Sequence, residues 1–381
     1  LARQTRGRGV EVTLVNAATH FVERPRLHQV AAGQQVADLP LRDLLAPTGA
    51  RLIVAGATGI DLRRREVALR TPDGRDGVAG YDTLVYALGS VIDLDRVPGV
   101  RAHAHALSDP AAAHRLGRDL RAQAARRGTL VVCGTGLTGI ESAAELAEAH
   151  PGLRVRLLGS HDPGAVLAPA GARHLRAGLD RLGVEVLPGA RITAVRAQAL
   201  TLADGREVVF DTCLWAGGFT VPTLARAAGL AVDGRGRVLV DGALRSRSHP
   251  EVCAIGDAAA AAGPWGDAIA YGCRTGAFMA PYAADAIADT LARRSPRRFG
   301  FRYIHQCISL GRHDAVVQFV HPRDEHPLRA VLTGRAALRY KELTLRGAVW
   351  TFRHPGPYLA RRRASGRAPA DAHREANGHA R

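Results

Sequence analysis

The sequence predicts an α/β protein with doubly wound, largely parallel sheets, and three observations support this. Short apolar runs alternate along the chain with longer helical segments, as parallel sheets with helical crossovers require. One apolar run, residues 130–133, leads into glycines at G-x-G-x-x-G spacing and then into an alanine-rich helical segment. The chain has 381 residues, which is long enough for two or three domains.

The elements follow in chain order from apolar runs bounded by glycine, proline and other turn residues. Strands are predicted at residues 10–15, 51–55, 66–70, 83–88, 130–133, 154–158, 184–186, 212–215, 252–255 and 316–320. Helices are predicted at residues 110–127, 142–150, 170–182 and 268–293, and residues 1–9 are predicted to end a helix. Turns are predicted at residues 72–74 and 204–205, and residues 361–381 are predicted to be a disordered basic tail.

The three glycines after residue 133 predict a nucleotide site. Gly134 would allow a tight turn, Gly136 would let the backbone approach a pyrophosphate, and Gly139 would let helix and strand pack closely. The N-terminus of the following helix would face the phosphate charge. The alternative is a glycine-rich turn that binds nothing. Because the motif lies in mid-chain, the nucleotide domain is inserted into another unit or follows one.

Composition narrows the class of protein. The net charge is +17, almost all from arginine because Lys341 is the only lysine. Coding bias of a GC-rich genome explains this, and attraction to an anionic membrane, an acidic carrier protein or nucleic acid is the functional alternative. Interleaved basic and aromatic residues are scarce, so no nucleic-acid partner is expected. No apolar run approaches the ~18 residues of a membrane span. The five cysteines form no C-x-x-C, so we expect neither a metal site nor a disulfide framework.

Four segments resemble the two-dinucleotide-binding flavoproteins of the pyridine nucleotide-disulfide oxidoreductase type, in particular the branch that contains type II NADH dehydrogenases. They are short segments spread over most of the length of the chain, at residues 81–90, 134–141, 236–259 and 301–316. The third is the most specific, because it ends in the strand and Gly-Asp turn of the second flavin motif.

The resemblance implies two doubly wound Rossmann-like domains, with an NAD(P)H domain inserted in an FAD domain, plus a small C-terminal α+β region. The implied boundaries are residues 1–108 and 229–296 for the FAD domain, 109–228 for the NAD(P)H domain, 297–360 for the C-terminal acceptor region and 361–381 for the tail. The implied enzyme passes hydride from NAD(P)H to FAD and electrons on to an acceptor, expected to be a quinone. The alternatives are a reductase of a small iron–sulfur protein and a flavin-deficient nucleotide-binding protein without turnover.

The resemblance also implies the binding residues, while no catalytic side chain is assigned. NAD(P)H would be bound by Gly134, Thr135, Gly136, Thr138, Gly139, Glu141, Ala216, Gly217 and Gly218. FAD would be bound by Asn16, Arg24, Ala87, Gly89, Gly256 and Asp257. Asp257 would accept a hydrogen bond from the flavin ribityl chain, and Glu141 would contact the nicotinamide side. The plainer alternatives are a helix N-cap for Asp257 and a first-turn carboxylate for Glu141.

The chain departs from the family pattern in four places. No G-x-G-x-x-G precedes residue 10, so the opening strand and glycine loop of the FAD domain, innermost in a 3-2-1-4-5 sheet, are missing. We therefore expect about 15 to 25 residues upstream of Leu1, and weak flavin binding and marginal stability without them. In the FAD domain, Asn16 stands where a carboxylate would hold the adenosine ribose. In the NAD(P)H domain, Gly159 stands where a carboxylate would bind the ribose 2′-hydroxyl, which predicts weak discrimination between NADH and NADPH. Residues 268–274 lack the glutamines found near the quinone.

Localisation and partners complete these expectations. A cytoplasmic protein is expected, with peripheral contact to the inner face of the cell membrane and a homodimer as further expectations. Residues 335–358 mix leucine and aromatic side chains with arginines, which is typical of an interfacial amphipathic element. The alternative is a strand or helix packed on the body of the protein.

Overall fold

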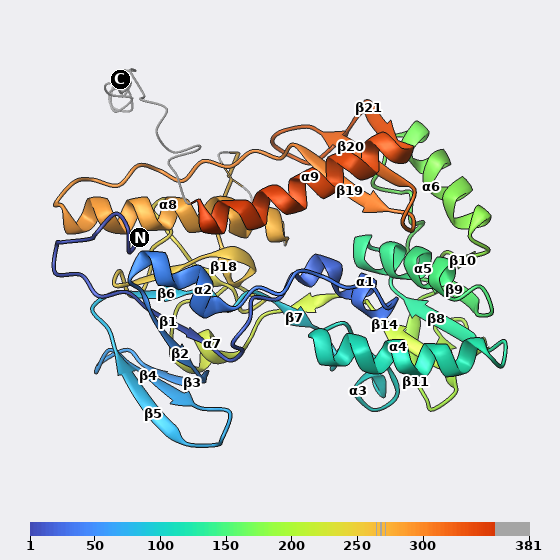
Figure 1. Cartoon of the computed structure of the whole chain (residues 1–381), viewed down its shortest axis with the longest axis horizontal. Coiled ribbons are helices and arrows are strands. Elements are labelled where there is room, and N and C mark those ends of the chain that lie inside the picture. The colour runs from blue at the N-terminus through green and yellow to red at the C-terminus, as the bar shows by residue number, and fades with distance from the viewer. Residues whose placement is uncertain (264, 267–268, 271, 355–381) are drawn as a thin grey trace, which may run out of the picture.

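The computed structural model describes residues 1–354 apart from 264, 267, 268 and 271, so the predicted tail at 361–381 lies outside the described residues. The fold is mixed α/β, as predicted (Figure 1). One half is built on a parallel sheet of order β10-β9-β8-β14. Its strands are β8 (Thr129–Cys133), β9 (Arg154–Leu158), β10 (Glu185–Leu187) and β14 (Thr212–Trp215).

Three helices pack beside this sheet (Figure 1). Helix α4 (Pro110–Ala124) precedes β8, α5 (Leu137–Ala149) connects β8 to β9, and α6 (Pro169–Arg181) connects β9 to β10. Every residue of β8 is buried, which explains why this strand is a continuous apolar run. A three-stranded antiparallel sheet of β11 (Ile192–Val195), β12 (Ala199–Leu202) and β13 (Glu207–Val209) precedes β14.

Among the described residues, the other half contains three separate pairs of parallel strands. The strand β1 (Thr13–Asn16) pairs with β2 (Arg51–Val54), β6 (Leu84–Tyr86) pairs with β17 (Val252–Ala254), and β16 (Val238–Leu239) pairs with β18 (Ala259–Ala260). The described strands do not join the pairs into one sheet. The expected 3-2-1-4-5 order therefore stays a prediction. An antiparallel meander lies beside the first pair and consists of β3 (Gly56–Asp61), β4 (Glu66–Arg70) and β5 (Asp76–Gly80).

Several expectations about the elements are wrong. Helix α5 begins at Leu137, five residues before the expected start at 142, and α4 ends at Ala124, three residues before the expected end at 127. Residues 1–9 form turns and no helix, because Gly7 and Gly9 have φ of 75° and 71°, in the left-handed region. The first strand begins at Thr13, three residues later than expected. The long helix α8 (Cys273–Leu291) begins five residues later than expected, directly after Gly272, whose φ is 153°.

The C-terminal region packs one helix on an antiparallel sheet. The strands β19 (His305–Ser309), β20 (Ala315–Val320) and β21 (Pro327–Thr333) are covered by α9 (Gly334–Arg353). In Figure 1, α8 and α9 lie along the upper side, and α9 reaches from the sheet back across the molecule. None of the helices in the described ranges is long and apolar enough to cross a membrane.

Short elements connect these units. The helices are η1 (Arg24–Arg26), α1 (Leu27–Ala31), α2 (Leu41–Leu45), η2 (Ala46–Thr48), α3 (Val100–His103), α7 (Leu224–Ala227) and η3 (Gly256–Ala258). The strands are β7 (Val91–Ile92), β15 (Phe219–Thr220), β16 (Val238–Leu239) and β18 (Ala259–Ala260). The largest apolar cluster joins α1, α4, α5 and α6 to β19 and β20, so the C-terminal sheet shares a core with the four-stranded parallel sheet.

Candidate functional site

The first and third glycines of the loop after β8 are required by backbone packing. Gly134 has a φ of 122°, and a Cβ there would lie 2.5 Å from the carbonyl oxygen of Ala216. A Cβ on Gly139 would overlap the carbonyl oxygen of Gly134, so α5 could not approach β8 as it does. Both positions therefore carry glycine for the reasons the spacing predicts.

The second glycine leaves the N-terminus of α5 open. A Cβ on Gly136 would meet no described heavy atom within 4 Å, and none of the described side chains caps α5 at this residue. The positive end of this 13-residue helix therefore has no side-chain cap at Gly136. A pyrophosphate fits this opening, since it needs close backbone approach and N–H donors.

The turn after β14 lies directly beside the loop. The Ala216 amide donates to the Cys133 carbonyl over 2.8 Å, and Gly218 has a φ of 125°. The Trp215 ring fills the space where a Cβ on Gly217 would lie, and its Nε1 donates to the carbonyl of Asp93 over 2.9 Å. The fold thus brings Gly134 and the predicted Ala216–Gly218 turn together at the carboxyl ends of adjacent strands.

Two threonines of the loop have structural contacts. The Thr135 hydroxyl donates to the carbonyl of His161 over 2.9 Å, which ties the loop to the chain after β9. The carbonyl of Thr138 accepts from the Ser142 hydroxyl over 2.6 Å within α5. The dinucleotide contacts assigned to both threonines stay predictions.

Glu141 points from α5 into a buried polar cluster shared with the C-terminal region. Its Oε1 accepts from the amide of Ser309 over 2.9 Å and pairs with Lys341. Lys341 also donates to the Ser309 hydroxyl over 2.7 Å. Burial raises the pKa of the Glu141 carboxyl, but Lys341 and the Ser309 amide outweigh burial and hold that pKa below its usual value. The predicted contact of Glu141 with the nicotinamide stays a prediction.

Neither Lys341 nor Ser309 is among the site residues predicted from the sequence. No feature of the sequence points to Ser309. Lys341 could have been found, because it is the only lysine in an arginine-rich chain. Lysine presents a compact charge and arginine a broad planar fork, so a small buried pocket beside a carboxylate favours lysine.

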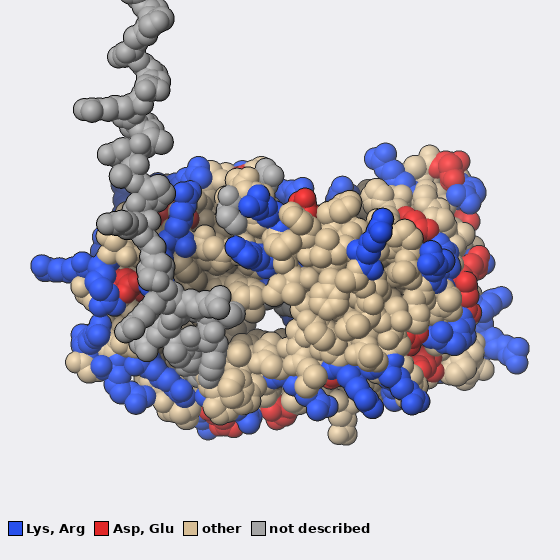
Figure 2. Space-filling view, turned by 90° about the horizontal axis from the view of Figure 1, so that it is seen from above, with Lys and Arg blue, Asp and Glu red and all other residues tan. Residues whose placement is uncertain are grey.

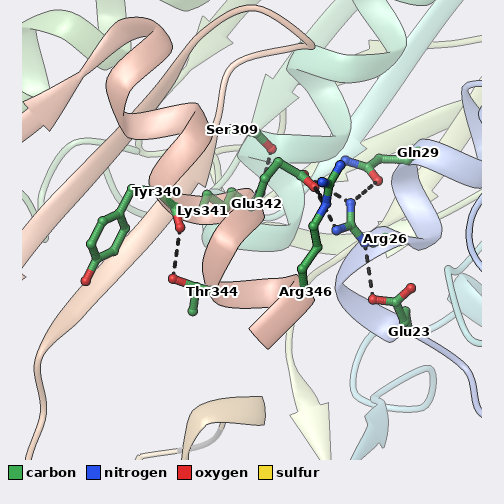
Figure 3. A network of polar contacts seen from close by, with 9 residues as sticks. All are labelled: Glu23, Arg26, Gln29, Ser309, Tyr340, Lys341, Glu342, Thr344 and Arg346. Carbon is green, nitrogen blue, oxygen red and sulfur yellow. Dashed lines mark hydrogen bonds and ion pairs between the residues drawn. The ribbon is translucent and has the colours of Figure 1, made fainter. Parts of the chain in front are cut away.

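The segment formed by η1 and α1 carries two further polar side chains, Arg26 and His28, and Figure 3 shows the contacts of Arg26 with α9. The Arg26 guanidinium donates to both carboxylate oxygens of Glu342 on α9, over 3.0 and 2.9 Å, and to Glu23 over 3.2 Å. The His28 side chain is buried, and its Nε2 has no hydrogen-bond partner among the described residues. Burial lowers the pKa of His28 to about 4, so the imidazole is neutral at pH 7.

The residues predicted to hold the flavin gather where β6 and β17 end. Asp257, in η3, accepts from the Ser90 hydroxyl over 2.6 Å and from the amide of Gly272, just before α8, over 2.8 Å. The Ser90 carbonyl accepts from Arg24 over 2.6 Å, and that guanidinium lies 6.0 Å from the centre of the Phe219 ring. Ser90 thus joins two predicted residues, although it was not predicted as a site residue itself.

Glycines leave this second site open as well. Gly89 and Gly256 have φ of 65° and 66°, and a Cβ on Gly89 would meet no described heavy atom within 4 Å. Ala87 directly follows β6, and Asn16 ends β1, where its Nδ2 donates to the Ala18 carbonyl over 2.6 Å. The FAD contacts assigned to these residues stay predictions, with Asn16 at the adenosine ribose and the others at the flavin end. A second G-x-G-x-x-G for the FAD pyrophosphate does not occur in the described residues.

Comparison with known proteins places these features in a family. Residues 1–280 match the sequence model of the pyridine nucleotide-disulphide oxidoreductases. An NADH dehydrogenase-like protein of Mycobacterium tuberculosis is 31% identical over 251 residues, which cover 62% of this chain and 62% of that relative. The alignment therefore spans less than two thirds of the relative's length.

Two further matches extend over more of the chain. A type II NADH:quinone oxidoreductase of M. tuberculosis is 28% identical over 356 residues, covering 81% of this chain and 74% of the relative. The solved structure of NDH2 from Plasmodium falciparum in complex with NADH superposes with a TM-score of 0.78 at 12% identity, covering 91% and 92% of the two chains. At that identity the superposition shows the fold alone. By the match over residues 1–280, this chain belongs to the pyridine nucleotide-disulphide oxidoreductase family.

Proposed function

We propose that this protein is an FAD-dependent NAD(P)H oxidoreductase that passes electrons to a quinone. The observation that carries the proposal is the uncapped N-terminus of α5 at Gly136, beside Gly134 and the Ala216–Gly218 turn. Family membership supports it, and so does the relative named for NADH and quinone. The same proposal includes the division into domains. The FAD domain consists of residues 1–108 and 229–296, the NAD(P)H domain of residues 109–228, and the C-terminal acceptor region of residues 297–360.

The residues divide into a nicotinamide side and a flavin side. Gly134, Gly136 and Gly139, with the first amides of α5, bind the NAD(P)H pyrophosphate, and the Ala216–Gly218 turn borders the nicotinamide. Arg24, Gly89 and Asp257 orient the flavin, with Ser90 holding Arg24 and Asp257 in place. The bound flavin supplies hydride acceptance and electron transfer, while the protein supplies alignment and electrostatics.

The acceptor has two candidates. The quinone is favoured by the name of the relative, a type II NADH:quinone oxidoreductase, and by the exposed Leu343 and Trp350 on α9, which suit a membrane surface. A small acidic iron–sulfur protein is favoured by the net charge of +17. A cytoplasmic protein bound peripherally to the inner face of the membrane follows from the first candidate.

The absorption spectrum of the purified protein tests the proposal. After incubation with FAD and removal of unbound flavin, which allows for the weak flavin binding expected above, we expect the absorption bands of oxidised flavin, and we expect NADH to bleach them under anaerobic conditions. A colourless protein that still binds NAD⁺ would instead support the nucleotide-binding alternative without turnover. A flavin spectrum unaffected by NADH and NADPH would contradict the proposal.

A further inference from the structure

The residue at the end of β9 decides which side chain can lie beside the adenosine ribose of a dinucleotide bound at the glycine loop. In dinucleotide folds an acidic residue at this strand end binds the ribose 2′-hydroxyl and repels a 2′-phosphate. Here the residue is Gly159, which is buried. A Cβ at this position would lie 2.5 Å from the Thr135 hydroxyl oxygen and 2.9 Å from the Thr135 amide nitrogen. A carboxylate side chain therefore cannot stand here unless the glycine loop moves.

Hydrogen bonds hold this close contact in place. The Thr135 hydroxyl donates to the carbonyl of His161 over 2.9 Å, so the loop after β9 is tied to the glycine loop. The carbonyl of Gly159 accepts from the amide of Ala190 over 2.9 Å, which fixes the strand end from the other side. Two separate bonds thus maintain the approach of Thr135 to Gly159.

The next acidic residue along the chain does not replace the missing charge. Asp162 pairs with Arg176 over 2.7 Å, and its other oxygen accepts from the amide of Gly164 over 2.7 Å. Its charge is therefore compensated and its oxygens are in use. Ser160 and His161 between them are exposed, and Arg191, directly after Ala190, is exposed as well. The local charge is neutral to positive, which does not repel a phosphate.

From this geometry we infer that the dinucleotide site accepts the 2′-phosphate of NADP(H) as readily as the 2′-hydroxyl of NAD(H), with the Thr135–Gly159 contact as the determinant. The inference rests on the proposed NAD(P)H site and adds its ligand specificity. A site without the acidic residue lacks a hydrogen bond that favours NAD(H), and it also lacks a negative charge that repels NADP(H). Both changes bring the affinities for NAD(H) and NADP(H) closer together.

Calorimetric titration of the full chain with NAD⁺ and with NADP⁺ tests the inference without requiring turnover. We expect the two dissociation constants to agree within about tenfold, which corresponds to about 1.4 kcal/mol. A preference for NAD⁺ beyond that would overturn the inference while leaving the dinucleotide site intact. Binding of neither nucleotide would contradict the proposed function itself, and this inference with it.

A charge variant locates the determinant. Ser160→Asp places a carboxylate next to Gly159 at an exposed position, so we expect NADP⁺ affinity to fall by at least about tenfold while NAD⁺ affinity changes by less than about threefold. Ser295→Asp adds the same charge at an exposed position after α8 and serves as the matched control, with no expected change in the ratio. An unchanged ratio in Ser160→Asp would show that the 2′ position lies elsewhere and would overturn the inference.

Discussion

At the scale of single residues, the pair formed by Lys341 and Glu141 has the largest expected effect on stability. Both side chains are buried, and Lys341→Met would leave the Glu141 carboxylate without its counter-charge. We expect the free energy of unfolding, measured by chemical denaturation, to fall by about 3–5 kcal/mol. The double variant Glu141→Gln, Lys341→Met should recover most of this loss, because it removes the uncompensated charge.

A matched pair on the same helix provides the control. Arg346 lies 3.9 Å from Glu342 and is largely exposed, so Arg346→Met should change the free energy of unfolding by no more than about 1 kcal/mol. An equal decrease of the free energy of unfolding in Lys341→Met and Arg346→Met would contradict the expectation that the buried pair of Glu141 and Lys341 matters more for stability than an exposed pair.

His28 makes stability depend on pH in a defined direction. Its pKa is about 4 in the folded protein against 6.5 for the free side chain, so the unfolded chain binds the proton more readily. The contribution of neutral His28 to the free energy of unfolding is therefore complete above pH 6.5. It is lost as the pH falls towards 4, by up to about 3 kcal/mol. We expect His28→Leu to show a shallower decline of stability over this range, whereas His321→Leu, at an exposed position, keeps the original decline. Parallel curves for His28→Leu and the unmodified protein would contradict this account.

At the scale of elements, α5 binds both the glycine loop and the C-terminal sheet. Three carboxylates on α5 contact the turn between β19 and β20 or its neighbours. Glu141 binds Ser309, Glu145 pairs with Arg312 over 3.4 Å, and Glu148 accepts from the Arg312 amide over 2.5 Å. Their spacing of four and three residues places them on one face of the helix. The helix that would bind the pyrophosphate is thereby held by the region expected to receive the acceptor.

Helix α9 has one packed face and one exposed face. Ala337 and Lys341 are buried against the sheet, and the Phe352 ring lies 4.8 Å from that of Phe21, so the helix packs on the body of the protein. Leu343 and Trp350 are 70% and 51% exposed among several arginines, which leaves membrane contact open as a proposal.

Flotation with anionic liposomes tests the exposed face of α9. We expect the protein to float with the vesicles, and Leu343→Ser with Trp350→Ser to reduce the bound fraction several-fold, because buried apolar area and basic charge act together. Leu328→Ser, at a 41% exposed position on β21, is the control and should bind normally. Equal flotation of the α9 variant and the control would show that α9 does not contact the bilayer.

At the scale of the whole molecule, the net charge of +17 separates the two acceptor candidates. On the face shown in Figure 2, lysine and arginine side chains are spread over the periphery and are not gathered into one patch. This distribution does not favour docking of an acidic protein on that face. We therefore expect turnover with a soluble quinone at saturating NADH to change by less than about twofold between 0.05 and 0.5 M salt. Activity that needs an acidic protein acceptor and falls steeply with salt would contradict the quinone proposal.

The sequence by itself determined the features that depend on neighbouring residues. The strand, glycine loop and helix at 129–149 could be predicted because each glycine serves a contact within this short segment or with the next strand. The apolar runs identified β8, β9 and α6 to within one residue, since buried parallel strands and amphipathic helices have distinct periods. Family membership followed from such local motifs and is confirmed.

The tertiary structure alone decided which distant side chains meet. Glu141 binds Ser309 and Lys341, which lie 168 and 200 residues further along the chain, and Ser90 contacts Asp257 across 167 residues. No local pattern encodes these pairs, because they arise from how α9 and β19 pack on α5 and how β6 aligns with β17. The contact of Thr135 with the end of β9 is of the same kind: the sequence showed that a carboxylate is missing at Gly159, and only the packing of two loops showed that there is no room for one.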